Sequence, residues 1–271
     1  NVEGINSKKN KMTDKMLKFT ENQRLIVAQI WGLKPEYFEV AAEKIASLGF
    51  DGIDLNLGCP VRDVVKKGAC SGMIGNFLAV NKIITAIKKG APKIPVSIKT
   101  RLGRENSEMP SWAEFLLGLD IAALTIHGRT AKLMSEGEAN WEEISKVVEI
   151  RNRMKIKTVI IGNGDVKNLD QAQEKYEKYG VDGVMIGRGI MENPWVFDTK
   201  NTPHSSAERL DLLKKHLQLF EEMDPDGHFD HLKKYFSIYV RDFPGARELR
   251  KKMMRAKGCD DAYYLFNSSI L

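Results

Sequence analysis

The sequence contains few cysteines and no long apolar segment. Only three of its 271 residues are cysteine, and they stand at Cys59, Cys70 and Cys259. So small and unevenly spaced a set does not form a disulfide framework, and we expect a reducing, cytoplasmic environment. No apolar run approaches the roughly 20 residues that a membrane-spanning helix needs. We therefore expect a protein that does not associate with membranes.

Several familiar functional motifs are also missing. No GxGxxG follows the first predicted strand, there is no P-loop, and the sequence supports no Ser-His-Asp triad. The five histidines lack the spacing of metal ligands, apart from His228 and His231, which have no cysteine nearby. We expect no metal site.

The composition is that of a globular protein with a basic surface. Hydrophobic residues make up 42% and charged residues 29%, the net charge is +6, and the isoelectric point is about 9.0. This balance permits a polyanionic partner such as nucleic acid without requiring one. The chain starts with Asn1 rather than Met, and its first segment contains no strand. We expect that the natural N-terminus is missing.

From residue 24 to residue 187 the sequence alternates short apolar runs with helical stripes. The predicted strands are 24–31, 52–57, 94–100, 122–127, 158–162 and 183–187, and the helices between them are 35–48, 78–89, 111–119, 141–152 and 169–179. Strict alternation predicts a parallel α/β fold with right-handed crossovers. Six strand–helix units are visible, so a TIM-type (β/α)8 barrel needs two more, which would lie in the missing N-terminus. An open doubly wound sheet is the alternative.

Polar residues stand at or just after the C-terminal end of every predicted strand. They are Gln29, Asn56, Lys99, His127, Asn163 and Arg188. Barrel enzymes build their sites on this rim, so the pattern favours the barrel over the open sheet. A lysine there can stabilise negative charge on a ring system as it is reduced, and neutral amides suit the donors and acceptors of a planar heterocycle.

Cys59 stands directly after the strand at 52–57, in the sequence Gly58-Cys59-Pro60. Pro60 cannot continue a ladder, so the chain must turn there. A cysteine just past a strand end is placed for chemistry. The alternative is a small buried apolar residue without a chemical role.

Two glycine-containing turns follow the last two predicted strands, at 162–165 and 187–189. In a complete barrel these would follow strands seven and eight, where loop amides commonly bind a phosphate. Two such turns with Arg188 between glycines indicate a phosphorylated cofactor. The alternative is that they are ordinary strand-to-helix turns.

After residue 200 the pattern becomes helical, with predicted helices at 206–223, 231–240 and 246–256. We therefore predict two domains, a barrel at 1–200 and a small helical domain at 201–271. The segment 233–257 carries nine bases against two acids. These bases form either a solvated helical face or a contact surface for nucleic-acid phosphates.

Seven motifs together resemble the tRNA-dihydrouridine synthases, which are FMN-dependent barrels. They are VAQIWG (27–32), DGIDLNLGCPVRDVVKKGACSGM (51–73), VSIKTRLG (96–103), TIHGRT (125–130), GEANW (137–141), IIGNGDV (160–166) and MIGRGIMENPWVF (185–197). The helical tail at 232–253 resembles the C-terminal domain of the bacterial branch. The resemblance covers roughly residues 1–260.

The resemblance implies an FMN cofactor, a tRNA substrate, NADPH as electron donor and a monomeric enzyme. Cys59 would be the general acid that gives a proton to C5 of a uridine, while reduced FMN passes a hydride to C6. The implied FMN ligands are Gln29, Asn56, Lys99, His127, Asn163, Gly164, Asp165, Gly187 and Arg188. The implied tRNA contacts are Arg101, Arg129, Lys233 and Lys234. The target uridine would have to leave its stack.

The sequence departs from the family in two places. The family begins with a strand that carries a Pro-Met-Ala turn, followed by a second strand, and neither is present here. Ser135 stands where the family usually has a tyrosine. Two other functions remain open: an FMN barrel that reduces a small free pyrimidine, and a non-catalytic RNA-binding remnant. The basic tail speaks against the first, and bound flavin would speak against the second.

Overall fold

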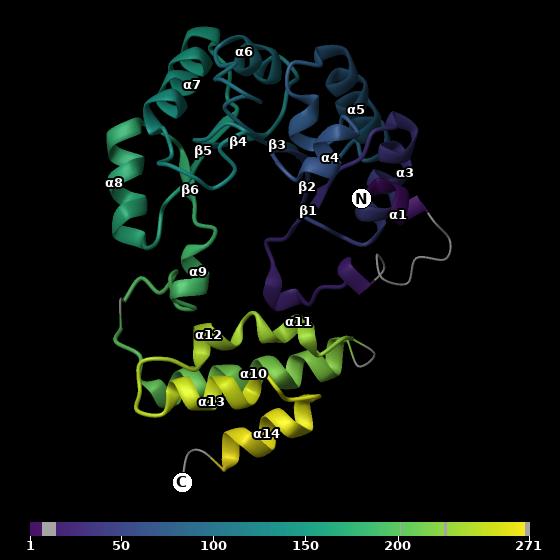
Figure 1. The fold of residues 1–271 in the computed structure, drawn as a ribbon. Coiled ribbons are helices and arrows are strands. Elements are labelled where there is room, and N and C mark those ends of the chain that lie inside the picture. The colour runs from purple at the N-terminus through teal and green to yellow at the C-terminus, as the bar shows by residue number, and fades with distance from the viewer. Residues whose placement is uncertain (7–14, 201, 225–226, 269–271) are drawn as a thin grey trace. The chain divides into compact units, whose positions relative to one another are not determined.

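The computed structural model describes residues 1–6, 15–200, 202–224 and 227–268 (Figure 1). The chain divides into two compact units, Asn1–Gly187 and Arg188–Leu271. The division lies earlier than the sequence-based boundary after residue 200, so Arg188 and its turn belong to the second unit. The sequence also suggests a short helix around residues 13–19, and its first part lies in 7–14, outside the described residues.

The first unit is built on a six-stranded parallel sheet. Its strands are β1 (Val27–Ile30), β2 (Gly52–Leu57), β3 (Val96–Arg101), β4 (Ala123–His127), β5 (Val159–Asn163) and β6 (Gly183–Met185). They neighbour one another in strict sequence order, β1-β2-β3-β4-β5-β6. A doubly wound sheet reverses its order at a switch point, so this sheet is singly wound. The TIM-type barrel fold class is confirmed, with six of its strand–helix units present.

The helices of this unit follow the outer side of the curved sheet (Figure 1). They are α1 (Val2–Asn6), α3 (Pro35–Ser47), α4 (Arg62–Lys66), α5 (Phe77–Gly90), α6 (Ser111–Leu117), α7 (Trp141–Met154) and α8 (Leu169–Tyr179). Asn76, Asn140 and Asn168 cap α5, α7 and α8, each accepting a hydrogen bond from the backbone N–H three residues ahead. Asn140 stands directly before the helix predicted at 141–152, which is where an asparagine cap is expected, and the structure confirms that cap.

Alternation along the strands separates a buried apolar face from a face that carries the polar side chains, as β2 shows most clearly. On β2, Ile53, Leu55 and Leu57 are essentially fully buried and belong to the core cluster shared with α3 and α5. Asp54 and Asn56 point to the opposite face, because successive side chains of a strand alternate. The core therefore lies between sheet and helices, and the inner face of the sheet is left for polar groups.

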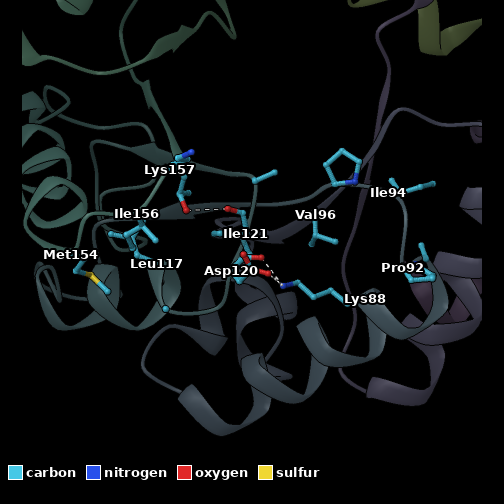
Figure 2. A pocket seen from close by; sticks show the side chains of 15 residues that line it. Lys88, Pro92, Ile94, Val96, Leu117, Asp120, Ile121, Met154, Ile156 and Lys157 are labelled. Atoms are coloured by element: carbon cyan, nitrogen blue, oxygen red, sulfur yellow. Dashed lines mark hydrogen bonds and ion pairs between the residues drawn. The ribbon is translucent and has the colours of Figure 1, made fainter.

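A cavity of about 740 Å³ opens at the N-terminal ends of β3, β4 and β5, where it is lined in part by Val96, Ala122 and Thr158 (Figure 2). Lys88 lies at its edge, where the ammonium donates to the carboxylate of Asp120 at 3.0 Å. This is the end of the sheet away from the polar strand ends, so the cavity is separate from the predicted site.

The second unit is helical around its own core. Its helices are α9 (Gly189–Glu192), α10 (Ser206–Met223), α11 (Asp230–Lys233), α12 (Phe236–Tyr239), α13 (Ala246–Met253) and α14 (Cys259–Asn267). The single helix predicted over 231–240 is wrong, because the chain breaks between α11 and α12. Phe236, Ile238 and Tyr239 are all buried, although residues at positions i, i+2 and i+3 do not share one face of a straight helix. The sequence also missed α14.

Within the described ranges, no single helix is long and apolar enough to cross a membrane. One bent pair, residues 62–73 with 77–90, passes that test by length and composition only.

Candidate functional site

The strand register gathers the predicted polar residues on the inner face of the sheet. Gln29 pairs with Asp54, and Asn56 with Lys99. Arg101 pairs with His127, which pairs with Asn163 on its other side. Five of the six predicted rim residues therefore lie side by side across β1 to β5. The sixth, Arg188, belongs to the other unit.

Asp54 begins a chain of hydrogen bonds that runs toward Cys59. Its carboxylate accepts from Ser97 Oγ at 2.7 Å and from Gln29 Nε2 at 2.8 Å. Gln29 Oε1 in turn accepts from Asn56 Nδ2 at 2.9 Å. Burial raises the pKa of Asp54, and the bonds from Ser97 and Gln29 oppose that rise. An amide has distinct donor and acceptor ends, so each bond fixes the orientation of the next group.

Asn56, the last residue of this chain of hydrogen bonds (the relay), binds the backbone of the loop that bears Cys59. Asn56 Oδ1 accepts from the backbone N–H groups of Gly58 at 2.9 Å and Cys59 at 3.1 Å. The Cys59 carbonyl accepts from the Ser71 hydroxyl at 2.8 Å. Cys59 is half-buried, so its position is fixed from both sides while its side chain remains partly accessible.

Cys70 lies against Cys59 from the buried side. Burial, together with the neighbouring Cys59, raises the pKa of the Cys70 thiol to about 12. Cys70 is therefore a protonated thiol at neutral pH, and Cys59 is the accessible member of the pair.

Arg101 is buried and connects the loops around Cys59 by donating hydrogen bonds to their backbone carbonyls. Its Nε donates to the Gly58 carbonyl at 2.7 Å, and one terminal nitrogen donates to the carbonyls of Thr130 at 2.9 Å and Met134 at 2.8 Å. Burial, with Arg129 nearby, lowers the pKa of Arg101 to about 10, so the guanidinium stays charged at neutral pH.

Lys99 lies near the middle of the inner face. Its ammonium donates to Asn163 Oδ1 at 3.1 Å, and Asn163 is oriented by its own bond to the Met185 carbonyl at 2.8 Å. Burial lowers the pKa of Lys99, Arg101 lowers it further, and Asp54 opposes the shift. A cation held by one neutral amide retains unused hydrogen-bonding capacity for a ligand.

His127 is held neutral by its surroundings. Burial, together with the nearby cations Arg101, Lys99 and Arg129, lowers the pKa of His127 to about 3. Its Nε2 lies 3.2 Å from an Arg129 nitrogen, which can only donate, so Nε2 accepts and the ring proton resides on Nδ1. Arg129 is fixed by both carboxylate oxygens of Asp165, at 2.7 and 2.6 Å.

Two glycines let the chain pass close to this network. A Cβ on Gly162 would lie 2.2 Å from the Trp141 ring, and one on Gly164 would lie 2.5 Å from Ala139 Cβ. Gly164 also has φ of +136°, a conformation that favours glycine. The turn predicted at 162–165 therefore requires its glycines for packing, and this requirement neither supports nor opposes a role in phosphate binding.

The predicted residues differ in how they are engaged. Arg101 and Arg129 are buried among carbonyls and a carboxylate, so this geometry gives them a positioning role. The Asp165 side chain is committed to Arg129, and any ligand contact at that position falls to the backbone. Lys233 pairs with Asp230 at 2.6 Å, and Lys234 lies over the Tyr235 ring. These two belong to the second unit.

Sequence reasoning missed Asp54, Ser71 and Ser97, whose hydrogen bonds orient the predicted residues. The period-two pattern already placed Asp54 on the face of Asn56, which is the signal that could have identified it. Among the described residues, no group of three His, Cys, Asp or Glu side chains could hold a metal ion.

Comparison with known proteins agrees with these motifs. A family model described as "Dihydrouridine synthase (Dus)" matches residues 5–269. The chain is 43% identical over 268 residues to a "Probable tRNA-dihydrouridine synthase" of Staphylococcus aureus (strain COL), covering 98% of this chain and 80% of that protein. It is 42% identical over 254 residues to "Probable tRNA-dihydrouridine synthase 2" of Bacillus subtilis (strain 168), covering 93% and 78%.

A solved structure of morphinone reductase overlaps more loosely, with a TM-score of 0.45, 16% identity, and coverage of 64% of this chain and 50% of that one. The family assignment rests on the sequence matches, which extend along nearly the whole chain and include every motif around Cys59 and Lys99. The chain belongs to the dihydrouridine synthase family.

Proposed function

We propose that this protein reduces the 5,6 double bond of uridines in tRNA, using FMN as its cofactor and NADPH as electron donor. The proposal rests on one observation above the others. Asn56 holds the Cys59 backbone and pairs across the strands with Lys99, a half-buried ammonium with one hydrogen-bond partner among the described residues, in a family whose curated members are named for dihydrouridine synthesis. One residue therefore connects the candidate proton donor with a candidate site for an electron-rich ring.

The inner face fits the isoalloxazine ring of FMN in its chemistry. Gln29 exposes an amide, Lys99 a cation, and His127 an Nδ1–H donor. A flavin pyrimidine ring carries both acceptors and donors, and its reduced form carries negative charge. The backbones at Gly164 and Gly187 are candidates for the phosphate; within the described residues, a Cβ on Gly187 would meet no atom within 4 Å. When bound and reduced, FMN would supply the hydride that adds to C6 of the uridine.

Cys59 would supply the proton that completes the reduction. Hydride addition at C6 builds enolate-like charge on the C5–C4 carbonyl system, and a thiol proton delivered to C5 neutralises it. The relay from Asp54 through Asn56 holds the Cys59 backbone, and Ser71 holds its carbonyl. These bonds set the direction of the thiol before the substrate arrives, which is how positioning contributes to rate.

Lys99 would stabilise negative charge on the reacting ring and would not itself transfer a proton. Its ammonium lies on the face of the sheet that Asn56 shares and is bound only to Asn163 among the described residues. Negative charge that develops on a ring oxygen would be stabilised there with little reorganisation, because the lysine is already fixed and partly desolvated.

The basic segment of the second unit, which includes Lys233 and Lys234, is proposed to contact tRNA phosphates. Arg247, Lys252 and Arg255 on and after α13 form no ion pair in the described part of the chain. Unneutralised bases on one helix suit a polyanion.

The decisive experiment supplies the FMN-loaded protein with NADPH and an unmodified tRNA transcript, and measures dihydrouridine by mass spectrometry of the digested RNA. Wild type should form dihydrouridine. Cys59→Ala should retain FMN and lose at least 100-fold in turnover, as general acids typically contribute that much. Cys259→Ala, which removes a buried thiol of the second unit, is the matched control. Activity on free uridine but not on tRNA would contradict the tRNA assignment, and full activity of Cys59→Ala would remove Cys59 from the mechanism.

A further inference from the structure

A groove of about 750 Å³ lies on the rim of the first unit, immediately beside the candidate proton donor. Its walls come from three segments: Pro60 with α4, the loop 104–108 after β3, and the loop 131–134 after β4. We call it the rim groove. Pro60 is covalently next to Cys59, so the groove begins where the proposed reaction takes place.

The rim groove is lined by more cations than anions. Arg62, Lys66, Arg104 and Lys132 contribute four positive charges, against Glu105 and Glu108. The two acids pair with Lys132 at 2.9 Å and Arg104 at 3.7 Å. Arg62 and Lys66 form no ion pair with any described residue. They stand four residues apart on α4, which places them on the same helix face.

The walls of the rim groove are held in place by buried contacts. Arg101 is 6% exposed and donates to the carbonyls of Gly58, two residues before the lining residue Pro60, and of Met134 in another wall, so one guanidinium joins the Cys59 loop to the loop after β4. The two strand-end loops are also joined directly, since Ala131 N–H donates to the Gly103 carbonyl and Lys132 N–H to the Arg104 carbonyl, both at 2.9 Å. A groove built this way is pre-formed and pays little ordering cost on binding.

We infer that the rim groove binds the ribose–phosphate backbone of the RNA next to the uridine being reduced, an inference that rests on the proposed function. A uridine held at Cys59 carries a phosphate on each side, so its backbone must leave the site across a neighbouring surface. Arg62 and Lys66 offer unpaired cations there, and Pro60, Val65 and Met134 offer apolar surface for sugar or base. The size suits one or two nucleotides, since pockets of about 300–1,000 Å³ hold ligands of that class.

This inference separates two kinds of RNA contact in one protein. The bases of the second unit would contact tRNA phosphates through a separate surface, whereas the rim groove acts on the nucleotides that flank the reacting base. Loss of the rim groove should therefore raise KM for tRNA even when the second unit is intact.

The test compares two double variants that remove the same charge from opposite ends of the sheet. Arg62→Gln/Lys66→Gln removes the unpaired cations of the rim groove. Lys93→Gln/Lys157→Gln removes two exposed lysines beside the cavity at the N-terminal strand ends. Binding of an unmodified tRNA transcript to FMN-loaded protein is measured by fluorescence anisotropy from 50 to 300 mM KCl. Because each phosphate contact contributes about 0.7–0.9 to the slope of log Kd against log salt, the rim variant should lose about 1.5 from that slope and the control nothing.

Turnover measurements distinguish the possible outcomes. We expect the rim variant to raise KM for tRNA roughly tenfold, by analogy with the loss of two phosphate contacts. A salt slope equal to that of the control overturns the inference. A raised KM for NADPH with an unchanged salt slope also overturns it and assigns the groove to the dinucleotide. If the rim variant loses the expected slope but wild type forms no dihydrouridine, the proposed reaction fails while the rim groove remains an RNA site.

Discussion

Replacement of Asp54 tests whether a carboxylate two strand positions before Asn56 controls the cysteine loop. Asp54→Leu removes the acceptor that orients Gln29, while Asp54→Asn retains an oxygen in the same place. In the asparagine variant the Ser97 hydroxyl can turn and accept from the new amide N–H, which leaves the asparagine oxygen free for Gln29. The relay to Asn56 and Cys59 should therefore persist in the asparagine variant and fail in the leucine variant.

The magnitude follows from the exposure of Gln29. An unsatisfied donor costs about 1–3 kcal/mol when buried, and the lower end applies because the Gln29 side chain is open to solvent in the described structure. A cost of about 1 kcal/mol corresponds to about a fivefold loss in the population of the correct amide orientation. We expect Asp54→Leu to lower kcat on tRNA and weaken FMN binding by about this factor or more, with Asp54→Asn close to wild type.

Stability should move differently from activity. Burial already raises the pKa of Asp54, so the ionised carboxylate is partly unfavourable in the folded protein. Replacing a buried charge by an apolar residue of similar size is often neutral or stabilising. Urea unfolding should therefore show Asp54→Leu within about 1 kcal/mol of wild type, as neutral replacement predicts. Wild-type kcat and FMN affinity in Asp54→Leu would refute the relay, and equal losses in both variants would show that charge, not orientation, is the active property.

Three further outcomes can be measured. Lys99→Met should weaken FMN binding, followed by flavin fluorescence, without lowering the unfolding temperature; unchanged affinity would contradict its cofactor role. Gly162→Ala should lose about 1–3 kcal/mol of stability in urea, because its Cβ would lie 2.2 Å from Trp141, whereas Gly183→Ala meets only an atom at 3.8 Å and is the control. His127 has its folded pKa depressed to about 3, so the unfolded state binds the extra proton and stability falls as pH drops from about 6.5 toward 3. His127→Gln should flatten this fall by at most about 1.4 kcal/mol per pH unit, and parallel pH profiles would contradict the assignment.

The barrel could be predicted because its signal is local. Each strand is an apolar run and each helix a stripe, and the predicted bounds of β2 and α8 match those observed residue for residue. The order of the strands depends on pairing between distant segments. Even so, the strict alternation of strands and helices, together with the polar residues at the strand ends, was enough to favour a barrel over a doubly wound sheet. The helices α4 and α9 were missed because four or five residues are too few to show a period.

The site was predictable in its members but not in their connections. Strand-end position identified Gln29, Asn56, Lys99, His127 and Asn163, because parallel strands bring their C-terminal ends to one rim. Which of them bond to one another depends on cross-strand register, which no single segment encodes. Asp54 is the clearest case, since its partners Gln29 and Ser97 are 25 and 43 residues away in the chain.

The inner face carries several cations, and they differ in the partners that compensate their charge. Arg129 is paired with the Asp165 carboxylate, and Arg101 donates hydrogen bonds to three backbone carbonyls. Lys99 has one amide oxygen and a distant attraction to Asp54. An ammonium taken out of water with so little compensation is costly, and an electron-rich ligand that accepts from it recovers part of that cost. Lys99 is therefore a partly desolvated cation on the face of the sheet that Asn56 shares, where it would stabilise negative charge that develops during reduction of a bound ring.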